Sequence, residues 1–274
     1  MTPVAVRGSL ALVTGAGSGI GRATALALAA RGGRLLCVDI DEVAAKATAE
    51  ACTAMGTAAL AFGVDVADRA GVMDLAATVT ADLGVLDILV NNAGVGVSGP
   101  FLDTPLADWD WIVGINLMGV VTFCSAFGGP MVQRGRGHVV NVSSGLAYTH
   151  RSTETAYGAT KAGVLALSRS LRADWRNAGV GVSAICPGVI NTPIVAHTRM
   201  RGSQADPATT AKAQRLFARG HPPERVAMAI LSAIARNRAV VPVGAEAWAT
   251  WLGHRLLPTD AFDRIVAGSH RLTT

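Results

Sequence analysis

The stretch LALVTGAGSGIGRA, residues 10–23, joins a short apolar run to a glycine-rich turn and the start of a helical pattern. Glycines at a strand-to-helix turn let backbone N–H groups approach a pyrophosphate, whose charge the positive end of the helix stabilises. The spacing is not the plain GxGxxG, because Gly17 is an extra glycine beside Gly15, Gly19 and Gly21. A P-loop is excluded, since no GK[ST] follows. The stretch predicts a dinucleotide site, although tight turns also use glycine for structural reasons alone.

The rest of the chain alternates between short apolar runs and longer helical patterns. After the run at 10–15, the apolar runs are RLLCVDI (34–40), ALAFGVDV (59–66), LDILVNNAG (86–94), GHVVNVSS (137–144), GVSAICPG (181–188) and AVVPVG (239–244). The helical patterns include 20–31, 41–55, 68–83, 116–134 and 154–178. Near-continuous apolar runs are typical of strands buried on both faces. The sequence therefore predicts an α/β fold, a doubly wound parallel sheet of about seven strands with helices on both faces.

The segment 191–222 interrupts this alternation with several prolines and glycines around a short helical pattern at 208–219. Such a long insertion after a strand is commonly a lid over a binding site. The tail, 245–274, has the pattern of short amphipathic helices. Because no linker composition separates these parts, we expect one domain over 1–274, with a cofactor-binding and catalytic core at 8–190.

Bulk composition excludes several classes of protein. Half of the residues are apolar and 16% are charged, so an extensive core is expected. The net charge of +5 comes from scattered arginines without a concentrated patch, which argues against a nucleic-acid partner. The six histidines and four cysteines form no metal-ligand pattern, so no metal is expected.

The chain has neither the layout of a signal peptide nor an unbroken apolar run of the roughly 18 residues that span a membrane. The cysteines lie far apart and no CxxC pair occurs among Cys37, Cys52, Cys124 and Cys186. Packed, reduced thiols are typical of the cytosol. The sequence therefore predicts a soluble, cytoplasmic protein without a membrane span.

Asp39 ends the second apolar run, where a carboxylate can accept hydrogen bonds from both hydroxyls of an adenosine ribose. A 2′-phosphate there would meet like charge, and the next residue is Ile40 rather than an arginine. The alternative is that Asp39 only caps the helix predicted at 41–55. The first interpretation favours NAD over NADP.

Tyr157 and Lys161 are four residues apart in a helical pattern and so share one helix face. They follow the serine pair Ser143 and Ser144. On spacing alone, a solvated lysine beside a half-buried tyrosine is the favoured explanation of the pair.

Taken together, these motifs resemble the classical short-chain dehydrogenase/reductases in order and spacing over about residues 8–190. The matching elements are TGAGSGIG, Asp39, DV at 65–66, NNAG at 91–94, Asn116, Ser144, YGATK at 157–161 and PGVINT at 187–192. One minor departure is Thr160, where the family often has serine. The resemblance implies a Rossmann-type fold and an NAD(P)-dependent reaction on a secondary alcohol or ketone.

The resemblance also assigns residues. Ser144, at the family's usual separation from the tyrosine, joins Tyr157 and Lys161 in a catalytic triad, and Asn116 extends it to a tetrad. The implied cofactor contacts are Gly15, Gly17, Ser18, Gly19, Ile20 and Gly21 in the turn, Asp39 and Ile40, Asp65 and Val66 at the adenine, Asn92, Ala93 and Gly94, Tyr157 and Lys161, and Pro187, Gly188, Ile190 and Thr192 near the nicotinamide.

These residue types suit the implied chemistry. Oxidising an alcohol requires a proton acceptor beside the carbinol, and free tyrosine titrates at about pH 10. A neighbouring ammonium favours the phenolate, so Lys161 is expected to lower the pKa of Tyr157. Ser144 can donate a hydrogen bond to the substrate oxygen.

Other functions remain open. A serine hydrolase would need a GxSxG turn, which the sequence lacks. A non-catalytic dinucleotide sensor or scaffold would keep the glycine turn but tends to lose the tyrosine or lysine. Epimerases and dehydratases share the scaffold as well.

The sequence does not identify the substrate or the direction of reaction. The candidate pocket walls are VGVSGPF (95–101), Tyr148, Ile194, Val195, Met200, Leu216 and Phe217. They favour a hydrophobic substrate, or they simply pack the lid on the core. Arg199 and Arg201 either meet an acidic group or are solvated. The resemblance implies a homodimer or homotetramer through helices 116–134 and 154–178, with Trp248, Trp251 and Leu252 in a second contact.

Overall fold

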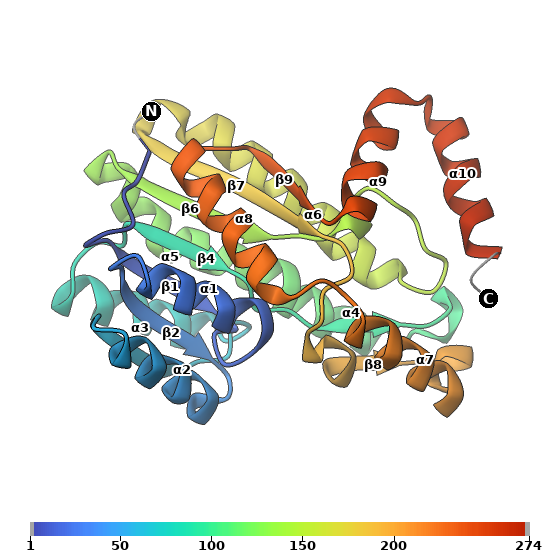
Figure 1. Cartoon of the computed structure of the whole chain (residues 1–274), viewed down its shortest axis with the longest axis horizontal. Coiled ribbons are helices and arrows are strands. Elements are labelled where there is room, and N and C mark those ends of the chain that lie inside the picture. The colour runs from blue at the N-terminus through green and yellow to red at the C-terminus, as the bar shows by residue number, and fades with distance from the viewer. Residues whose placement is uncertain (1–2, 272–274) are drawn as a thin grey trace.

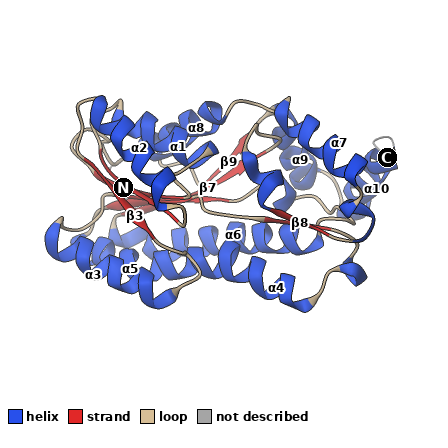
Figure 2. Ribbon diagram, turned by 90° about the horizontal axis from the view of Figure 1, so that it is seen from below, coloured by secondary structure: helices blue, strands red, loops and turns tan. Residues whose placement is uncertain are grey.

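The computed structural model describes residues 3–271 and has three layers, with one sheet between two groups of helices. The sheet has seven parallel strands in the order β3-β2-β1-β4-β6-β7-β9. Figure 2 shows α1, α2 and α8 on one face and α3, α5 and α6 on the other. The predicted α/β fold with a doubly wound parallel sheet is confirmed.

The elements of this sheet and its two helical layers have the following bounds. The strands are β1 (Leu10–Thr14), β2 (Arg34–Asp39), β3 (Ala59–Gly63), β4 (Ile88–Asn91), β6 (Gly137–Val142), β7 (Val180–Pro187) and β9 (Val240–Val243). The helices are α1 (Gly19–Ala29), α2 (Glu42–Ala54), α3 (Arg69–Asp82), α4 (Leu106–Val113), α5 (Gly119–Arg134), α6 (Thr155–Asp174) and α8 (Pro223–Arg236).

Side chains of each central strand point alternately into two separate cores. In β1, Ala11 and Val13 pack with the α1, α2 and α8 layer, whereas Leu10 and Leu12 pack with the α3, α5 and α6 layer. Successive residues of a strand face opposite sides of the sheet, so a strand buried on both faces needs an unbroken apolar run. This explains why the runs in the sequence are continuous rather than alternating.

Two features of the fold differ from the sequence prediction. Strand β3 lies at the edge of the sheet and is only partly buried, with Leu60 48% exposed, so its apolar run does not indicate a central strand. The helical patterns predicted from the sequence also omit α4 and α8. The short strands β5 (Gly96–Ser98) and β8 (Thr198–Met200) were not predicted either. Strands of three residues carry too little pattern to be detected before their partner is known.

A continuous helical stretch, Leu106–Arg134, runs through α4, a π-helical segment and α5. Within the described residues it is long and apolar enough to cross a membrane by length and composition, a feature that sequence analysis missed. Its side chains instead pack into the fold: Phe123, Phe127 and Met131 are buried in the core beneath α5. This stretch is a core helix. The π-helical segment, Gly114–Met118, places Asn116 at its centre.

The segment 191–222, called the lid after its predicted role, and the tail occupy one end of the molecule, where α7, α9 and α10 gather in Figure 1. The lid contains β8 and α7 (Pro207–Ala218), and β8 pairs with β5 as a separate two-stranded sheet. The tail forms α9 (Ala245–Leu256) and α10 (Thr259–Arg271) as predicted; its last residues, 272–274, lie outside the described part of the chain.

Candidate functional site

The glycine turn between β1 and α1 is held in a shape that only glycine permits at several positions. Gly15 and Gly19 have φ of 63° and 49°, in the left-handed region. A Cβ at Gly21 would collide with the carbonyl oxygen of Gly15. Asn92, after β4, donates from its side chain to the carbonyl oxygens of Thr14 (3.0 Å) and Gly15 (3.2 Å). In this structure Asn92 therefore holds the turn in place.

Asp39 approaches the same turn from the end of β2. Its Oδ2 accepts a hydrogen bond of 2.8 Å from the backbone N–H of Gly17, and a Cβ on Gly17 would lie 2.9 Å from that oxygen. The cap of α2 comes instead from Asp41, whose Oδ1 accepts from Ala44 N at 3.0 Å. The interpretation of Asp39 as only the cap of α2 is therefore wrong, because Asp41 caps that helix.

The first turn of α1 is open to an anion. Ser18, at its N-cap, makes no capping hydrogen bond with its side chain within the described structure. The N-terminal N–H groups of a helix without such a cap are free to bind phosphate oxygens. A tight glycine turn, uncapped amides and a carboxylate at the end of β2 together fit a dinucleotide.

Other predicted cofactor residues lie around this turn. Asp65 is exposed and its Oδ1 accepts from Ala67 N at 2.9 Å, while Val66 is buried beneath α5, where a Cβ on Gly119 would touch it. Ile40 is 73% exposed beside Asp39. An exposed isoleucine next to the Asp39 carboxylate offers an apolar surface for a planar group.

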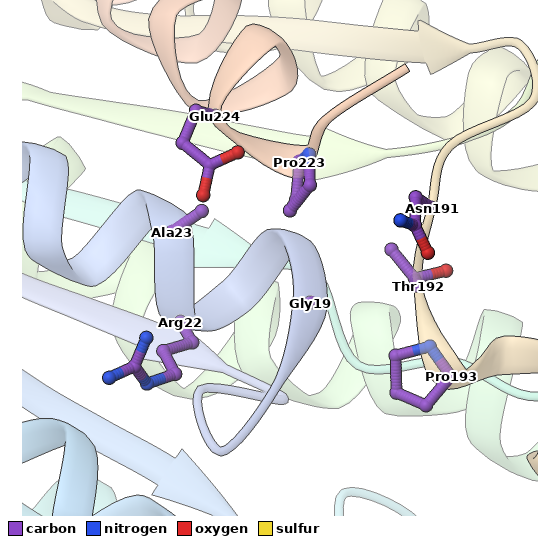
Figure 3. A pocket seen from close by; sticks show the side chains of 8 residues that line it. All are labelled: Gly19, Arg22, Ala23, Asn191, Thr192, Pro193, Pro223 and Glu224. Carbon is purple, nitrogen blue, oxygen red and sulfur yellow. The ribbon is translucent and has the colours of Figure 1, made fainter. Parts of the chain in front are cut away.

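The segment after β7 closes the other side of the turn. Ile190 is buried in the core, and Thr192 lies against the first residue of α1, because a Cβ on Gly19 would be 3.0 Å from Thr192 Cγ2. A pocket of about 240 Å³ opens here, and Figure 3 shows Thr192 and Pro193 across it from Gly19. Its lining is Gly19, Arg22, Ala23, Asn191, Thr192, Pro193, Pro223 and Glu224. Pro187 and Gly188 begin this segment, and Gly188 N donates to Val243 O at 2.9 Å.

Ser144, Tyr157 and Lys161 come together at the carboxyl end of β6. Ser144 follows β6, and the other two residues share one face of α6. Lys161 Nζ lies 5.7 Å from the centre of the Tyr157 ring and donates a hydrogen bond of 3.1 Å to Val142 O. Ser144 lies close enough to Tyr157 to act on the pKa of its phenol, and its Oγ accepts from Leu146 N at 3.1 Å. Ser143 differs: its hydroxyl donates to Lys161 O at 2.7 Å and holds α6 against β6.

Burial dominates the titration of this cluster. It raises the pKa of Tyr157 to about 12, against a smaller lowering by the hydrogen bond from Ser144. It lowers the pKa of Lys161 to about 8. The net shift of the Tyr157 pKa is therefore upward, opposite to the lowering expected from Lys161, because removing the phenolate charge from water is costly.

Asn116 connects α5 to the same cluster. It is fully buried; its Nδ2 donates to Val95 O at 2.9 Å and to Thr160 Oγ1 at 3.3 Å, and its Oδ1 accepts from Val95 N at 2.9 Å. Thr160 in turn donates to Tyr157 O at 2.8 Å. A Cβ on Gly94 would lie 3.2 Å from Asn116 Oδ1 and 3.3 Å from Lys161 Nζ. Gly94 therefore separates these two polar groups, with Ala93 just before it.

Sequence reasoning missed Glu246, which begins the tail. Its Oε1 accepts from Val189 N at 3.0 Å, and a Cβ on either Gly188 or Gly244 would meet the same oxygen. Its Oε2 lies 3.3 Å from His221 Nε2 at the end of the lid. The sequence does show a glycine at the end of each of two strands, Gly188 and Gly244. No local pattern, however, indicates that the Glu246 carboxylate packs against both of them.

Comparison with known proteins decides the family. The model for the short chain dehydrogenase family matches residues 9–202. The chain belongs to this family. The resemblance of its motifs to this family is thereby confirmed.

Relatives cover most of the chain. It is 44% identical over 256 residues to the probable oxidoreductase EphD of Mycobacterium tuberculosis, which covers 91% of this chain; the chain spans 43% of that protein. It is 41% identical over 199 residues to a D-threitol dehydrogenase of Mycolicibacterium smegmatis, covering 73% of this chain and 76% of that one. A short chain dehydrogenase/reductase from Burkholderia phymatum, solved in complex with NAD, superposes with a TM-score of 0.84 at 32% identity over 92% of this chain and 94% of its own.

Proposed function

We propose that this protein interconverts a secondary alcohol and a ketone, with Tyr157 as the acid/base. The observation that carries the proposal is the meeting of Tyr157 with Ser144 and with the buried Lys161 at the carboxyl end of β6. In open parallel α/β sheets, ligands bind at this end of the strands. The glycine turn and Asp39 lie at the same end, so both halves of a dinucleotide reaction are served by one edge of the sheet.

Each residue of the cluster has a role in moving one proton. The Tyr157 hydroxyl takes a proton from the alcohol or returns it to the ketone oxygen. Ser144 donates a hydrogen bond to that oxygen as negative charge develops on it. Lys161 brings positive charge near the phenol and is held by Val142 O. Asn116 holds the segment at Val95 and donates to Thr160, the residue before Lys161. A bound nicotinamide supplies the hydride acceptor or donor.

We also propose that NAD is the preferred cofactor. Asp39 presents a carboxylate beside Gly17 N, where it would accept ribose hydroxyls and repel a 2′-phosphate. The residues assigned to the cofactor from the resemblance belong to this proposal, with two refinements. Ile190 is buried, so its backbone rather than its side chain faces the cofactor, and Asn92 acts by holding the glycine turn.

A hydrophobic substrate is proposed because the wall predicted from 95–101 and the lid is largely apolar. Phe101 is 58% and Leu216 50% exposed, so both have surface to offer. Tyr148 is a less suitable wall, since it is 2% exposed and its ring lies 6.1 Å from that of His254 in the tail.

The remaining assignments concern the whole chain. We propose a single working domain, with a core at 8–190, a lid at 191–222 and the tail at 245–274, that assembles as a homodimer or homotetramer in the cytoplasm. The four cysteines are free and buried, which suits a reducing compartment.

A panel of secondary alcohols tests the reaction. The alcohols are offered with NAD⁺, and formation of NADH is followed by its near-ultraviolet absorbance. We expect turnover of apolar secondary alcohols by the parent and none by Tyr157→Phe. Equal rates for the two proteins on every alcohol that the parent accepts would contradict the proposed mechanism.

A further inference from the structure

Asp108 is a buried carboxylate outside the catalytic cluster. It lies in the first turn of α4 and is 2% exposed. A carboxylate is almost never buried to this extent unless it is paired, because removing its charge from water is costly. Both of its partners, Arg199 and Arg201, come from the lid, 91 and 93 residues further along the chain.

Three hydrogen bonds tie Asp108 to two arginines of the lid. Arg199 Nη1 donates to Oδ1 at 2.8 Å, Arg201 Nε donates to Oδ2 at 2.6 Å, and Arg201 Nη2 donates to Oδ1 at 3.1 Å. Arg201 therefore binds both oxygens as a fork, which is the strongest form of this pair. The Arg201 guanidinium, with Arg199, holds the pKa of Asp108 below its usual range.

A second contact fixes the plane of one arginine. The guanidinium of Arg199 lies over the ring of Trp111, 3.8 Å from its centre, one turn along α4 from Asp108. Such a cation–π contact adds orientation as well as attraction. The sequence left open whether Arg199 and Arg201 are solvated or meet an acidic group. In the structure they meet Asp108, an acid of the chain itself.

The backbone of this part of the lid is docked as well. Strand β8 pairs in parallel with β5, with Arg199 opposite Val97, and Arg201 N donates to Ser98 O at 2.8 Å. Gly99 allows the approach, because a Cβ there would lie 2.7 Å from Arg201 Cβ. Val97 is buried in one apolar cluster with Ile112 of α4, and Tyr157 packs against that cluster. The position of β8 is thereby linked to the catalytic tyrosine through a single layer of side chains.

The second half of the lid is held differently. None of the twelve residues of α7 is buried, although all of them are described. Leu216 is 50% exposed, and Arg215 and Arg219 are exposed on the same helix. Segments with few buried contacts open at the lowest free energy.

We propose that Asp108 is a positioning residue that fixes β8 as a permanent wall of the substrate site, so that the lid opens by movement of α7 alone. The substrate specificity set by β8 is then present before any ligand binds, whereas α7 admits and releases the substrate. The description of this wall as part of a substrate site rests on the function proposed above. The contacts of Asp108 with Arg199 and Arg201, which we call the latch, do not rest on it, and their test needs no turnover.

Limited digestion with trypsin, read by mass spectrometry, tests the latch. In the parent protein we expect early cleavage after Arg215 and Arg219 and resistance after Arg199 and Arg201. Asp108→Asn keeps the shape of the side chain but removes its charge, and it should speed cleavage after Arg199 and Arg201 by about tenfold or more. Asp110→Asn is the matched control: it makes the same change on an exposed residue of the same helix and should leave the pattern unchanged.

A second variant covers the case in which Asp108→Asn does not fold, which circular dichroism would reveal. Arg201→Gln removes the fork from its more exposed side and should expose the bond after Arg199 to the same degree. Early cleavage of the parent after Arg199, or resistance after Arg199 in every folded latch variant, would overturn the proposal.

Kinetics separate a positioning role from general damage. With a substrate from the alcohol panel, Asp108→Asn should raise KM by about tenfold and leave the dissociation constant of NADH within about twofold of the parent value. An equal rise in KM and in the dissociation constant of NADH would show that Asp108 supports the whole fold rather than β8. If no alcohol is turned over by the parent, the proposed function fails while the digestion still decides the latch.

Discussion

At the scale of single residues, Tyr157 is the acid/base that we propose, and its surroundings set the pKa of its phenol. Burial raises its pKa to about 12, which favours the phenol at neutral pH. A phenol is the form required to protonate a ketone oxygen, whereas alcohol oxidation requires the phenolate. Oxidation is therefore expected to depend on positive charge beside the ring that favours the phenolate.

Tyr157→Phe should reduce turnover by about 10²–10⁴-fold or more, because the sole proton acceptor is lost. The ring still packs, so the affinity for NADH, measured by fluorescence titration, should stay near that of the parent.

Lys161→Ala should weaken NADH binding as well and shift the rise of the oxidation rate towards higher pH, since it removes the charge that favours the phenolate. In the parent, oxidation should speed up from about pH 7 to pH 9 while reduction should not. Oxidation rates that are flat with pH in both proteins would contradict this assignment.

Asp39→Asn tests the preference for NAD. The amide keeps an acceptor for Gly17 N but removes the negative charge that repels a 2′-phosphate. We expect the ratio of NADPH to NADH dissociation constants to fall by roughly tenfold to a hundredfold, corresponding to about 1–3 kcal/mol. Asp41→Asn is the control, because asparagine caps a helix as well as aspartate does and Asp41 caps α2. A parent protein that binds NADPH as tightly as NADH would refute the role given to Asp39.

At the scale of elements, the pairing of β6 with β7 contains a buried histidine. His138 Nε2 lies 2.8 Å from Ser183 Oγ, which donates to Arg238 O at 2.5 Å. Because that serine proton is already committed, the ring nitrogen serves as the donor to Ser183. Burial, with a smaller effect from the Arg172 charge, lowers the pKa of His138 to about 4.

The free energy of unfolding should consequently depend on pH through His138. Its folded pKa is about 4, below the ordinary value of 6.5, so the unfolded chain binds the proton more tightly. The stability is complete above that ordinary value and is lost as pH falls towards 4, by about 2 kcal/mol between pH 7 and pH 5. Urea unfolding at several pH values measures this.

The matched variants are His138→Gln and His197→Gln. The first should lower stability at pH about 7 by removing a buried hydrogen bond, yet flatten the loss between pH about 7 and 5 by removing the titrating group. The second replaces an exposed lid histidine and should keep the slope of the parent. An unchanged slope in His138→Gln would mean that other groups govern the acid dependence.

At the scale of the whole molecule, α5 and α6 turn small residues outward. Ala162 and Ala166 of α6 and Ser125 and Gly129 of α5 are exposed, and a Cβ on Gly129 would meet nothing within 4 Å. Faces of small residues allow helices of two subunits to approach closely, which supports the proposed assembly.

Ala166→Arg should break that assembly, because a long charged side chain would be forced between the two helices. Light scattering should then fall from the mass of a dimer or tetramer towards that of the 28.0 kDa chain. Ala54→Arg, at the exposed end of α2, adds the same side chain elsewhere and should leave the mass unchanged. A parent protein that is monomeric at micromolar concentration would refute the proposed oligomer.

Local patterns in the sequence were enough to predict a parallel sheet of about seven strands and the family resemblance. The apolar runs and the motifs at 14–23, 91–94 and 157–161 are local, and each requires only its neighbours along the chain to be recognised. The side chains of the candidate catalytic cluster could be chosen on the same basis, because Tyr157 and Lys161 are one helical turn apart and Ser144 ends the preceding apolar run.

Tertiary structure alone decided which distant groups meet. The contacts of Asp108 with Arg199 and Arg201, of Glu246 with Val189 N, and of Asn116 with Val95 join segments that no periodicity connects. The packing around the ring also set the sign of the pKa shift at Tyr157, since burial outweighs the lowering by Ser144. Local pattern reflects the conformation of a short segment, whereas pairing and desolvation depend on the whole folded chain.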